Sequence, residues 1–382
     1  MNPLYEAMSV SVFERMSRAA AQHDAVNLGQ GFPDFGWPEP VLEKAAAALQ
    51  GYNQYAPSRG LPVLRQAIAD HYRRHFGQEL SPDHITVTSG ATEALGAAIL
   101  AAGSPGDEVI LFAPAYDCYA PMVRRAGGTP VEVKLAAPEF VLDTDAIAHA
   151  VSDKTRAIIL TNPHNPTGRL YRTSELQVIA DIAVAHDLIV ISDEVWEHLL
   201  LDGQQFVPLA TLPGMAERTI KTGSAGKIFS LTGWKIGWIV ADPALGEVVA
   251  RAHQFLTFSS APNLQEAVAF GLGQDQWIAP MQQRFARARD RLTNGLEYAG
   301  YSVIRPEATY FLAVDLAASG IDADDEAFAM RAVKEAGVAV VPMSAFTEVG
   351  PETHLVRLCF AKQDATIDAG IEAMGRARNL LA

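Results

Sequence analysis

Two lysines in one short segment have the surroundings and spacing of a cofactor site. Lys227 lies in Ser224-Ala-Gly-Lys227-Ile, where small neighbours leave its amine approachable, and Lys235 follows eight residues later. A lysine that forms an imine has to lose its proton easily, whereas a lysine that binds a phosphate has to keep its charge. Together they suggest a covalently held phosphate cofactor, with pyridoxal phosphate as the first candidate. Taken alone, the segment is also compatible with an exposed loop, so the interpretation depends on the rest of the chain.

A turn after a predicted strand offers a place for an anion. Residues 88–93 read Thr-Ser-Gly-Ala-Thr-Glu and open a predicted helix. Gly90 and Ala91 leave backbone N–H groups free to face a ligand, and the positive end of a helix favours an anion. The segment therefore predicts a phosphate-binding turn. The alternative is an ordinary strand–turn–helix with Thr92 as the helix N-cap.

A second turn holds polar side chains between residues that stiffen the backbone. Residues 162–168 read Asn-Pro-His-Asn-Pro-Thr-Gly and follow another predicted strand. Because prolines restrict the backbone, a side-chain amide of this turn can be aimed at a single ligand atom. A rigid turn without a ligand is the alternative, but ligands bind beyond the ends of strands in sheets of this kind.

Two charged residues lie at the end of, or inside, apolar strands, where each needs a partner. Asp193 closely follows the apolar run 188–192. A buried carboxylate requires a cation, and a protonated pyridine nitrogen would serve, whereas a metal ion and a helix cap are competing uses. Arg357 lies inside the run 355–359. Its guanidinium is expected to bind a substrate carboxylate or, alternatively, to form an internal salt bridge.

The elements that must position these residues alternate between short apolar strands and helices from about residue 84 to residue 240. Continuous apolar runs are typical of strands buried on both faces, and their alternation with helices predicts a mainly parallel sheet between helical layers. The expected strands are 84–88, 108–112, 157–161, 188–192, 219–222 and 236–241, and the expected helices include 92–102 and 174–186. The fold class is therefore predicted to be α/β.

The last third of the chain has a different pattern, which predicts a second, smaller α+β domain. A long helical pattern runs from about residue 265 to residue 299. Later strands are expected at 302–304, 310–315, 338–341 and 355–359, with helices at 325–336 and 365–381. We expect the N-terminal segment to pack with this part. The predicted boundaries are 41–280 for a large cofactor-binding domain, and 1–40 with 281–382 for a discontinuous small domain.

Composition narrows the functional classes. The 382 residues are 49% hydrophobic, and 30 basic against 44 acidic residues give a net charge of −14. A negative surface argues against nucleic acid or an anionic membrane as the partner. Cys118 and Cys359 are the only cysteines, so we expect no disulfide framework and no metal site. The sequence has neither a signal-peptide pattern nor an apolar run of membrane length, and a cytoplasmic location is expected.

With these motifs together, the chain resembles the fold-type I pyridoxal-phosphate enzymes of aminotransferase class I/II. The resemblance spans nearly the whole length and rests on Asn165-Pro-Thr-Gly, Asp193-Glu-Val, Ser224-Ala-Gly-Lys227, Gly233-Trp-Lys235-Ile-Gly and Arg357. Within the class, segments 27–35, 53–55, 116–119 and 357–362 are most similar to the kynurenine/glutamine and methionine aminotransferase group. The resemblance implies a large domain with a mainly parallel seven-stranded sheet between helices, and a smaller α+β domain.

The resemblance also implies roles for the residues around the cofactor ring. Lys227 would form the imine and carry the proton between the substrate Cα and the cofactor. Asp193 would keep the pyridine nitrogen protonated, Asn165 would bond the 3-oxygen of the ring, and Tyr116 would stack on the ring. Trp196 stands where the family usually has a tyrosine that donates to the 3-oxygen. We therefore expect a changed imine pKa or a different ring tilt.

Further residues are assigned to the phosphate and the substrate by the same resemblance. The phosphate would be bound by Gly90, Ala91, Thr92, Ser224 and Lys235, and by Tyr55 of the partner subunit. The α-carboxylate of the substrate would bind Arg357, with help from Asn165 and the Gly31 backbone. The substrate side chain would meet Phe13 and Phe258 of the partner subunit.

The function that the resemblance implies is transamination in a homodimer with shared active sites. An amino group would move between an L-amino acid (methionine, glutamine, aromatic or kynurenine-like) and a 2-oxo acid by a ping-pong mechanism. Two alternatives use the same cofactor: a cysteine-S-conjugate β-lyase and an N-succinyldiaminopimelate aminotransferase. A non-catalytic effector-binding module is an alternative of a different class.

Overall fold

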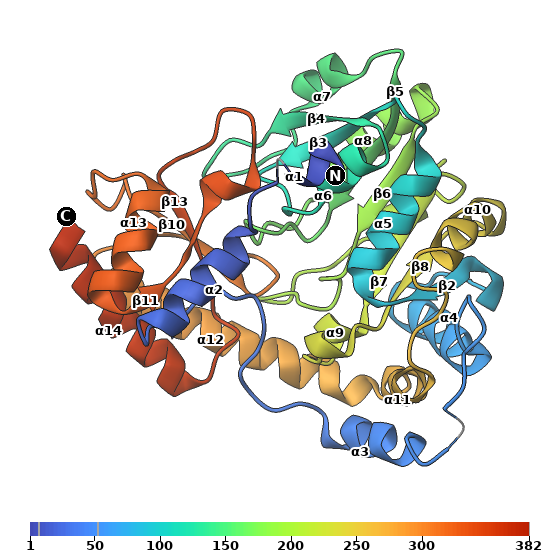
Figure 1. Cartoon of the computed structure of the whole chain (residues 1–382), viewed down its shortest axis with the longest axis horizontal. Helices are drawn as coiled ribbons and strands as arrows, with labels where there is room; N and C mark the ends of the chain where they lie inside the picture. The colour runs from blue at the N-terminus through green and yellow to red at the C-terminus, as the bar shows by residue number, and fades with distance from the viewer. Residues whose placement is uncertain (7, 52, 382) are drawn as a thin grey trace.

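A seven-stranded sheet forms the centre of the computed structural model, which describes residues 1–6, 8–51 and 53–381 (Figure 1). The strand order is β2-β8-β7-β6-β5-β3-β4. All neighbours are parallel except β8, which runs antiparallel to both β2 and β7. The strands are β2 (Ile85–Thr88), β3 (Glu108–Ala113), β4 (Thr129–Lys134), β5 (Thr155–Thr161), β6 (Ile189–Asp193), β7 (Thr219–Ser224) and β8 (Gly237–Val240). The predicted α/β class with a mainly parallel sheet is confirmed.

The inner strands of this sheet are buried on both faces, which explains the continuous apolar run of a strand such as β3. In β3, Val109 and Leu111 pack in one hydrophobic cluster, whereas Ile110 and Phe112 pack in another on the opposite face. A strand covered on both sides needs apolar residues at every position. The helices associated with this part of the chain are α3 (Glu39–Ala48), α4 (Pro62–Phe76), α5 (Gly90–Ala102), α6 (Tyr119–Arg125), α7 (Thr144–Ala150), α8 (Thr173–Ala185), α9 (Ala225–Ile228), α10 (Pro243–Gln254) and α11 (Pro262–Leu272).

A second structural unit combines the C-terminal third of the chain with its N-terminal segment. Its antiparallel sheet has the order β12-β13-β10-β9. The strands are β9 (Ser302–Ile304), β10 (Phe311–Asp315), β12 (Val341–Pro342) and β13 (Leu355–Cys359), and the helices are α2 (Val12–Gln22), α12 (Ile278–Tyr298), α13 (Asp325–Arg331) and α14 (Asp364–Leu381). The short α1 (Pro3–Glu6) lies instead beside α6 (Figure 1). β1 (Val26–Asn27) pairs in parallel with β11 (Val338–Ala339), so the N-terminal segment lies against the C-terminal part. The exact domain boundaries remain predictions.

The structure departs from the sequence prediction at three places: one strand was not predicted, and two predicted elements are interrupted. β4 is an edge strand that contains Pro130 and polar residues, so it lacks the continuous apolar run that identified its neighbours. The long helical pattern is interrupted after α11, where Gly273 is the C-cap. The predicted strand 338–341 divides at Val340, because β11 pairs with β1 whereas β12 pairs with β13.

Among the residues that the structure describes, none of the helices combines the length and the hydropathy that a membrane-spanning helix requires.

A buried ionic cluster lies beside the ends of β6 and β7. Lys221 Nζ is 2.8 Å from Glu194 and 2.6 Å from Glu197, and all three side chains are 1% exposed. The hydroxyl of Tyr72 donates to Glu197 at 3.1 Å, and its ring centroid is 4.0 Å from the ammonium. The two carboxylates raise the pKa of Lys221, which keeps it charged. The cluster ties the segment after β6 to β7.

Replacing Lys221 with methionine should lower the free energy of unfolding by about 3–5 kcal/mol, because Glu194 and Glu197 would stay buried without their cation. Urea unfolding followed by circular dichroism measures the change. Lys44→Met, on the exposed face of α3, is the matched control and should stay within about 0.5 kcal/mol of the original protein. Equal losses in the two variants would contradict the role of the cluster.

Candidate active site

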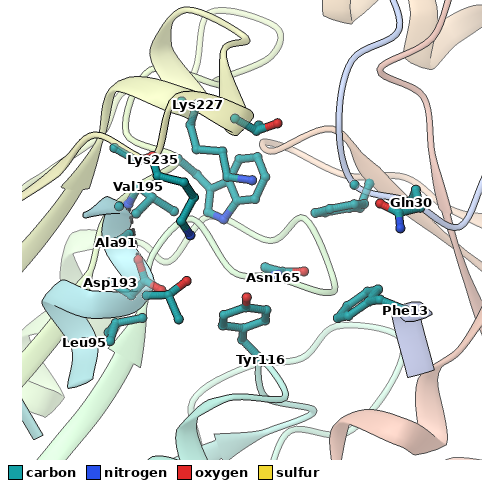
Figure 2. A pocket seen from close by; sticks show the side chains of 18 of the residues that line it. Phe13, Gln30, Ala91, Leu95, Tyr116, Asn165, Asp193, Val195, Lys227 and Lys235 are labelled. Carbon is teal, nitrogen blue, oxygen red and sulfur yellow. Dashed lines mark hydrogen bonds between the residues drawn. The ribbon is translucent and has the colours of Figure 1, made fainter. Parts of the chain in front are cut away.

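The carboxyl ends of β5, β6 and β7 converge on one cavity of about 260 Å³. Adjacent parallel strands end at the same edge of the sheet, so the loops that follow them meet there. Figure 2 shows Lys227 and Lys235 entering the cavity together, with Asn165 and Tyr116 facing them and Phe13 and Gln30 on the side away from Asp193. The predicted site residues that line it are Phe13, Gly31, Gly90, Ala91, Thr92, Tyr116, Asn165, Asp193, Trp196, Ser224, Lys227, Lys235 and Arg357.

Lys227 lies in α9, the single helical turn that follows β7. Its Nζ donates a hydrogen bond to the hydroxyl of Tyr310 at 3.0 Å and is 4.3 Å from the ring centroid of Trp196. Removal from water lowers the pKa of this amine to about 8, because burial disfavours the charged form. A lysine in this environment is available as a neutral nucleophile and base far more readily than one in water.

Asp193 is a buried carboxylate held by hydrogen bonds rather than by a cation. Tyr119 donates to Oδ2 at 2.6 Å and Thr222 donates to Oδ1 at 3.1 Å. Burial raises the pKa of Asp193, although these bonds act in the opposite direction. No basic side chain in the described ranges forms an ion pair with it, so a cationic group in the cavity would offset its desolvation. A protonated pyridine nitrogen has the required charge and donor.

The other end of the cavity is shaped for an anion. Gly90 has a φ of 77°, and an added Cβ there would lie 3.1 Å from Nζ of Lys235. A Cβ on Gly237 would lie 2.6 Å from the backbone nitrogen of Ala91, so only glycine lets β8 approach the turn this closely. The N-terminus of α5, the ammonium of Lys235 and the nearby Ser224 are suitable ligands for a phosphate.

The same turn decides between the two interpretations of Thr92. Ser89 occupies the N-cap position of α5, and the helix begins at Gly90. Thr92 therefore lies inside the first turn of the helix, and the alternative in which it is the N-cap is wrong. Its side chain lines the cavity instead.

Arg357 is a buried guanidinium whose hydrogen-bond partners are neutral. It is 1% exposed, donates to Asn165 Oδ1 at 2.9 Å and to the Gly29 carbonyl at 3.2 Å, and lies 3.8 Å from the ring centroid of Phe311. No acidic side chain among residues 1–6, 8–51 and 53–381 forms a salt bridge with it, so the internal-salt-bridge alternative fails. Its Nε also lacks a partner in that part of the chain. The group is therefore suited to a carboxylate ligand.

Tyr55 and Phe258 are the two predicted site residues that do not line this cavity. Their rings meet edge to face with centroids 5.7 Å apart, and Tyr55 is 84% exposed. The third predicted aromatic, Phe13, lies on α2 at the cavity wall, with its ring centroid 5.7 Å from that of Phe346. Phe13 is thus part of the cavity, whereas the exposed pair is not among the residues that line it.

Sequence reasoning missed Tyr310 and Gln30. The hydroxyl of Tyr310 contacts Lys227, and Gln30 lines the cavity near Phe13. Tyr310 reads locally as part of an apolar strand, and Gln30 lies in the segment 27–35 noted only for resemblance. A possible signal for Tyr310 was its hydroxyl, because a buried phenol usually has a hydrogen-bond partner.

Comparison with known proteins identifies relatives along the whole chain. The family model described as aminotransferase class I and II matches residues 23–374. A probable N-succinyldiaminopimelate aminotransferase from Mycobacterium tuberculosis is 44% identical over 381 residues, covering 96% of each chain. A methionine aminotransferase from Escherichia coli is 39% identical over 371 residues, again covering 96% of each.

Solved structures agree with this relationship. The N-succinyldiaminopimelate aminotransferase structure from Mycobacterium tuberculosis superposes with a TM-score of 0.95 at 44% identity, covering 98% of this chain and 99% of the other. The Escherichia coli protein with methionine aminotransferase function gives a TM-score of 0.94 at 38% identity, covering 98% of each chain. The chain belongs to the class I and II aminotransferases, and it is a pyridoxal-phosphate-dependent enzyme of fold type I.

Proposed function

We propose that this enzyme transfers the amino group of an L-amino acid with an uncharged side chain, such as methionine, glutamine, phenylalanine or kynurenine, to a 2-oxo acid by a ping-pong mechanism. The observation that carries the proposal is the arrangement of charges in one cavity. Lys227, Lys235 and Arg357 approach it from different elements, and Asp193 lies buried beside them. These groups match the four charged or reactive positions that a pyridoxal phosphate and an amino-acid carboxylate require.

Each charged group then has one task. Bound pyridoxal phosphate withdraws electrons from the Cα of the substrate, which makes its C–H bond acidic. Asp193 keeps the ring nitrogen protonated, and Lys235 with Ser224 and the N-terminus of α5 binds the phosphate. Lys227 Nζ, as a neutral amine, would remove the Cα proton and hold it at Nζ.

The neutral residues orient these reactants. Asn165 accepts a hydrogen bond from Arg357 through its carbonyl oxygen, which leaves its NH2 group to donate to the ring oxygen. Arg357 binds the α-carboxylate of the substrate, with the backbone of Gly31 beside it. Tyr116 covers one side of the ring position. Proton transfer at Cα depends on this alignment, because reacting groups must be held near their attack geometry.

The charge balance of the cavity favours an uncharged substrate side chain. Its basic lining residues, within the described ranges, are Lys227, Lys235 and Arg357, and the proposal assigns all three. The lining residues therefore offer no additional cation that could pair with a carboxylate on the substrate side chain. Phe13 and Phe311 provide apolar surface where the side chain would lie.

N-succinyldiaminopimelate is the second candidate amino donor. The observation in its favour is the 44% identity over 96% of each chain to the probable N-succinyldiaminopimelate aminotransferase. Its additional carboxylates would need cations from outside the lining of the cavity. Arg15, Arg124 and Arg125 lie along an adjoining groove that shares Tyr116 with the cavity. Arg15 pairs with Glu326 and Arg124 pairs with Glu348, so these two would have to exchange a carboxylate of the protein for one of such a longer substrate.

The proposed assembly is a homodimer in which each subunit completes the active site of the other. Tyr55, 84% exposed, and Phe258, 43% exposed, form an aromatic pair outside the cavity of their own subunit. Exposed aromatic clusters are typical of interfaces. In the proposed dimer, Tyr55 binds the phosphate in the neighbouring site and Phe258 lines the substrate pocket there.

The proposed location is the cytoplasm. Cys118 and Cys359 are free thiols, which supports a reducing compartment.

The Lys227→Ala variant should lose both the visible absorbance of lysine-bound pyridoxal phosphate and nearly all turnover. The variant removes the only amine that the proposal uses as nucleophile and base. Absorption spectroscopy of the purified protein and a coupled transamination assay measure the two effects. Lys154→Ala, at an exposed position, should retain both. Turnover retained by Lys227→Ala would contradict the proposed mechanism.

A panel of amino donors against several 2-oxo acids should show the highest kcat/KM for donors with uncharged side chains. Aspartate and glutamate should be weaker because their second carboxylate meets no free cation in the cavity lining. Preference for N-succinyldiaminopimelate would favour the second candidate. Formation of pyruvate and ammonia from a cysteine S-conjugate without an oxo acid would indicate β-lyase chemistry.

Mixing two inactive variants should restore activity if the active sites are shared. Tyr55→Ala and Lys227→Ala each damage a different half of the proposed composite site, so a hybrid dimer contains one site with both residues intact. Activity after subunit exchange, relative to each variant alone, measures this complementation, and sedimentation velocity reports the assembly. A monomer with full activity would contradict the proposed dimer.

A further inference from the structure

The hydroxyl of Tyr310 links Lys227 to the loop at Gly31, which the proposed function places beside the substrate carboxylate. Tyr310 precedes β10 and is 1% exposed. Its oxygen accepts a hydrogen bond from Lys227 Nζ at 3.0 Å, and its own hydrogen is donated to the Gly31 carbonyl at 2.6 Å. Lys227 and Tyr310 come from the two structural units, so this short chain of hydrogen bonds crosses from one unit to the other.

The single hydrogen of the phenol group determines whether Tyr310 donates or accepts in each of its two hydrogen bonds. A phenol has one hydrogen, and a carbonyl is an acceptor only. Because Tyr310 donates that hydrogen to Gly31, its oxygen can only accept from Lys227. Burial also raises the pKa of the Tyr310 hydroxyl well above its usual value, which keeps the phenol neutral. Tyr310 is therefore unsuited to act as an acid or a base and suited to hold one N–H of the lysine.

The surrounding packing holds Tyr310 in this position. The ring of Trp196 stands perpendicular to that of Tyr310 with centroids 4.6 Å apart, and Trp196 is itself 2% exposed. A Cβ on Gly31 would lie 2.7 Å from the ring of Phe311, so the loop approaches this closely only because residue 31 is glycine. The packing therefore holds in place both the ring of Tyr310 and the Gly31 carbonyl that accepts its hydrogen bond.

We propose that Tyr310 is a positioning residue for Lys227. Whenever Nζ is a free amine, the Tyr310 oxygen accepts a hydrogen bond from one of its N–H groups and so restricts rotation about the Cε–Nζ bond, leaving the lone pair to face the substrate Cα. The hydrogen bond to the Gly31 carbonyl fixes the position of the Tyr310 hydroxyl relative to the loop beside Arg357. The proposal rests on the proposed role of Lys227 and adds a residue that the sequence did not indicate.

The Tyr310→Phe variant tests this proposal through the amine itself. Cofactor-free protein is mixed with pyridoxal phosphate, and the rate of appearance of visible absorbance is measured across pH. Only the neutral amine reacts, so the rate of the original protein should rise with pH through a midpoint near the pKa of about 8. Loss of the acceptor destabilises the ammonium form, so the midpoint should fall by about one pH unit in the variant.

Steady-state kinetics provide the second measurement. Loss of orientation should lower kcat by about tenfold to a hundredfold. The KM of the amino donor should change little, because Arg357 and Asn165 are unaltered. Tyr171→Phe is the matched control, since Tyr171 is 3% exposed and its hydroxyl has no hydrogen-bond partner in the described part of the chain. The control should keep the midpoint and kcat of the original protein.

Two results would overturn the role of Tyr310 alone. One is a Tyr310→Phe variant with unchanged midpoint and kcat. The other is a variant that differs only by a lower Tm, which is the result expected of a purely structural tyrosine. An original protein that captures no pyridoxal phosphate would instead overturn the assignment of Lys227 on which the proposal rests.

Discussion

The carboxylate of Asp193 is buried at the end of β6 with hydrogen-bond donors around it but no ion pair among the described residues. Such a group is costly to bury unless a cation arrives. The strands β5, β6 and β7 end at the same edge of the sheet, so the loops that follow them form one cavity in front of the carboxylate. A cation that binds in this cavity can offset the desolvation of Asp193. In the proposed mechanism, Asp193 would meet the protonated ring nitrogen of pyridoxal phosphate, whose positive charge would offset the buried carboxylate.

The proposed mechanism gives Lys227 and Lys235 different roles, as a base and as a phosphate ligand, and the surroundings of the two amines differ. Lys227 lies against Trp196 and Tyr310, where desolvation lowers the pKa of its amine to about 8. Lys235 lies beside the turn at Gly90, where a bound phosphate would stabilise its charge. One segment of chain can therefore supply both a base and an anion ligand, because the sheet places the two amines in different environments.

Fold prediction succeeded where a local pattern has a single physical cause. Strands of the central sheet are buried on both faces, so continuous apolar runs indicated them. β4 was missed because an edge strand retains polar residues, and the helical pattern from residue 265 did not reveal the interruption at Gly273. Partner choice is also non-local: β11 and β12 are almost contiguous, yet they pair with β1 and β13.

The sequence by itself determined the chemical groups of the site, because Lys227, Asp193 and Asn165 follow predicted strands whose ends must meet at one edge of a parallel sheet. It left Arg357 with two interpretations and gave no role to Tyr310. Tertiary structure removed one interpretation of Arg357 and brought Tyr310 into contact with Lys227. Arg357 makes no salt bridge in the described part of the chain, and Tyr310 meets Lys227 across 83 residues of sequence. Desolvation and hydrogen-bond pairing depend on which distant segments pack together, and no local pattern contains that information.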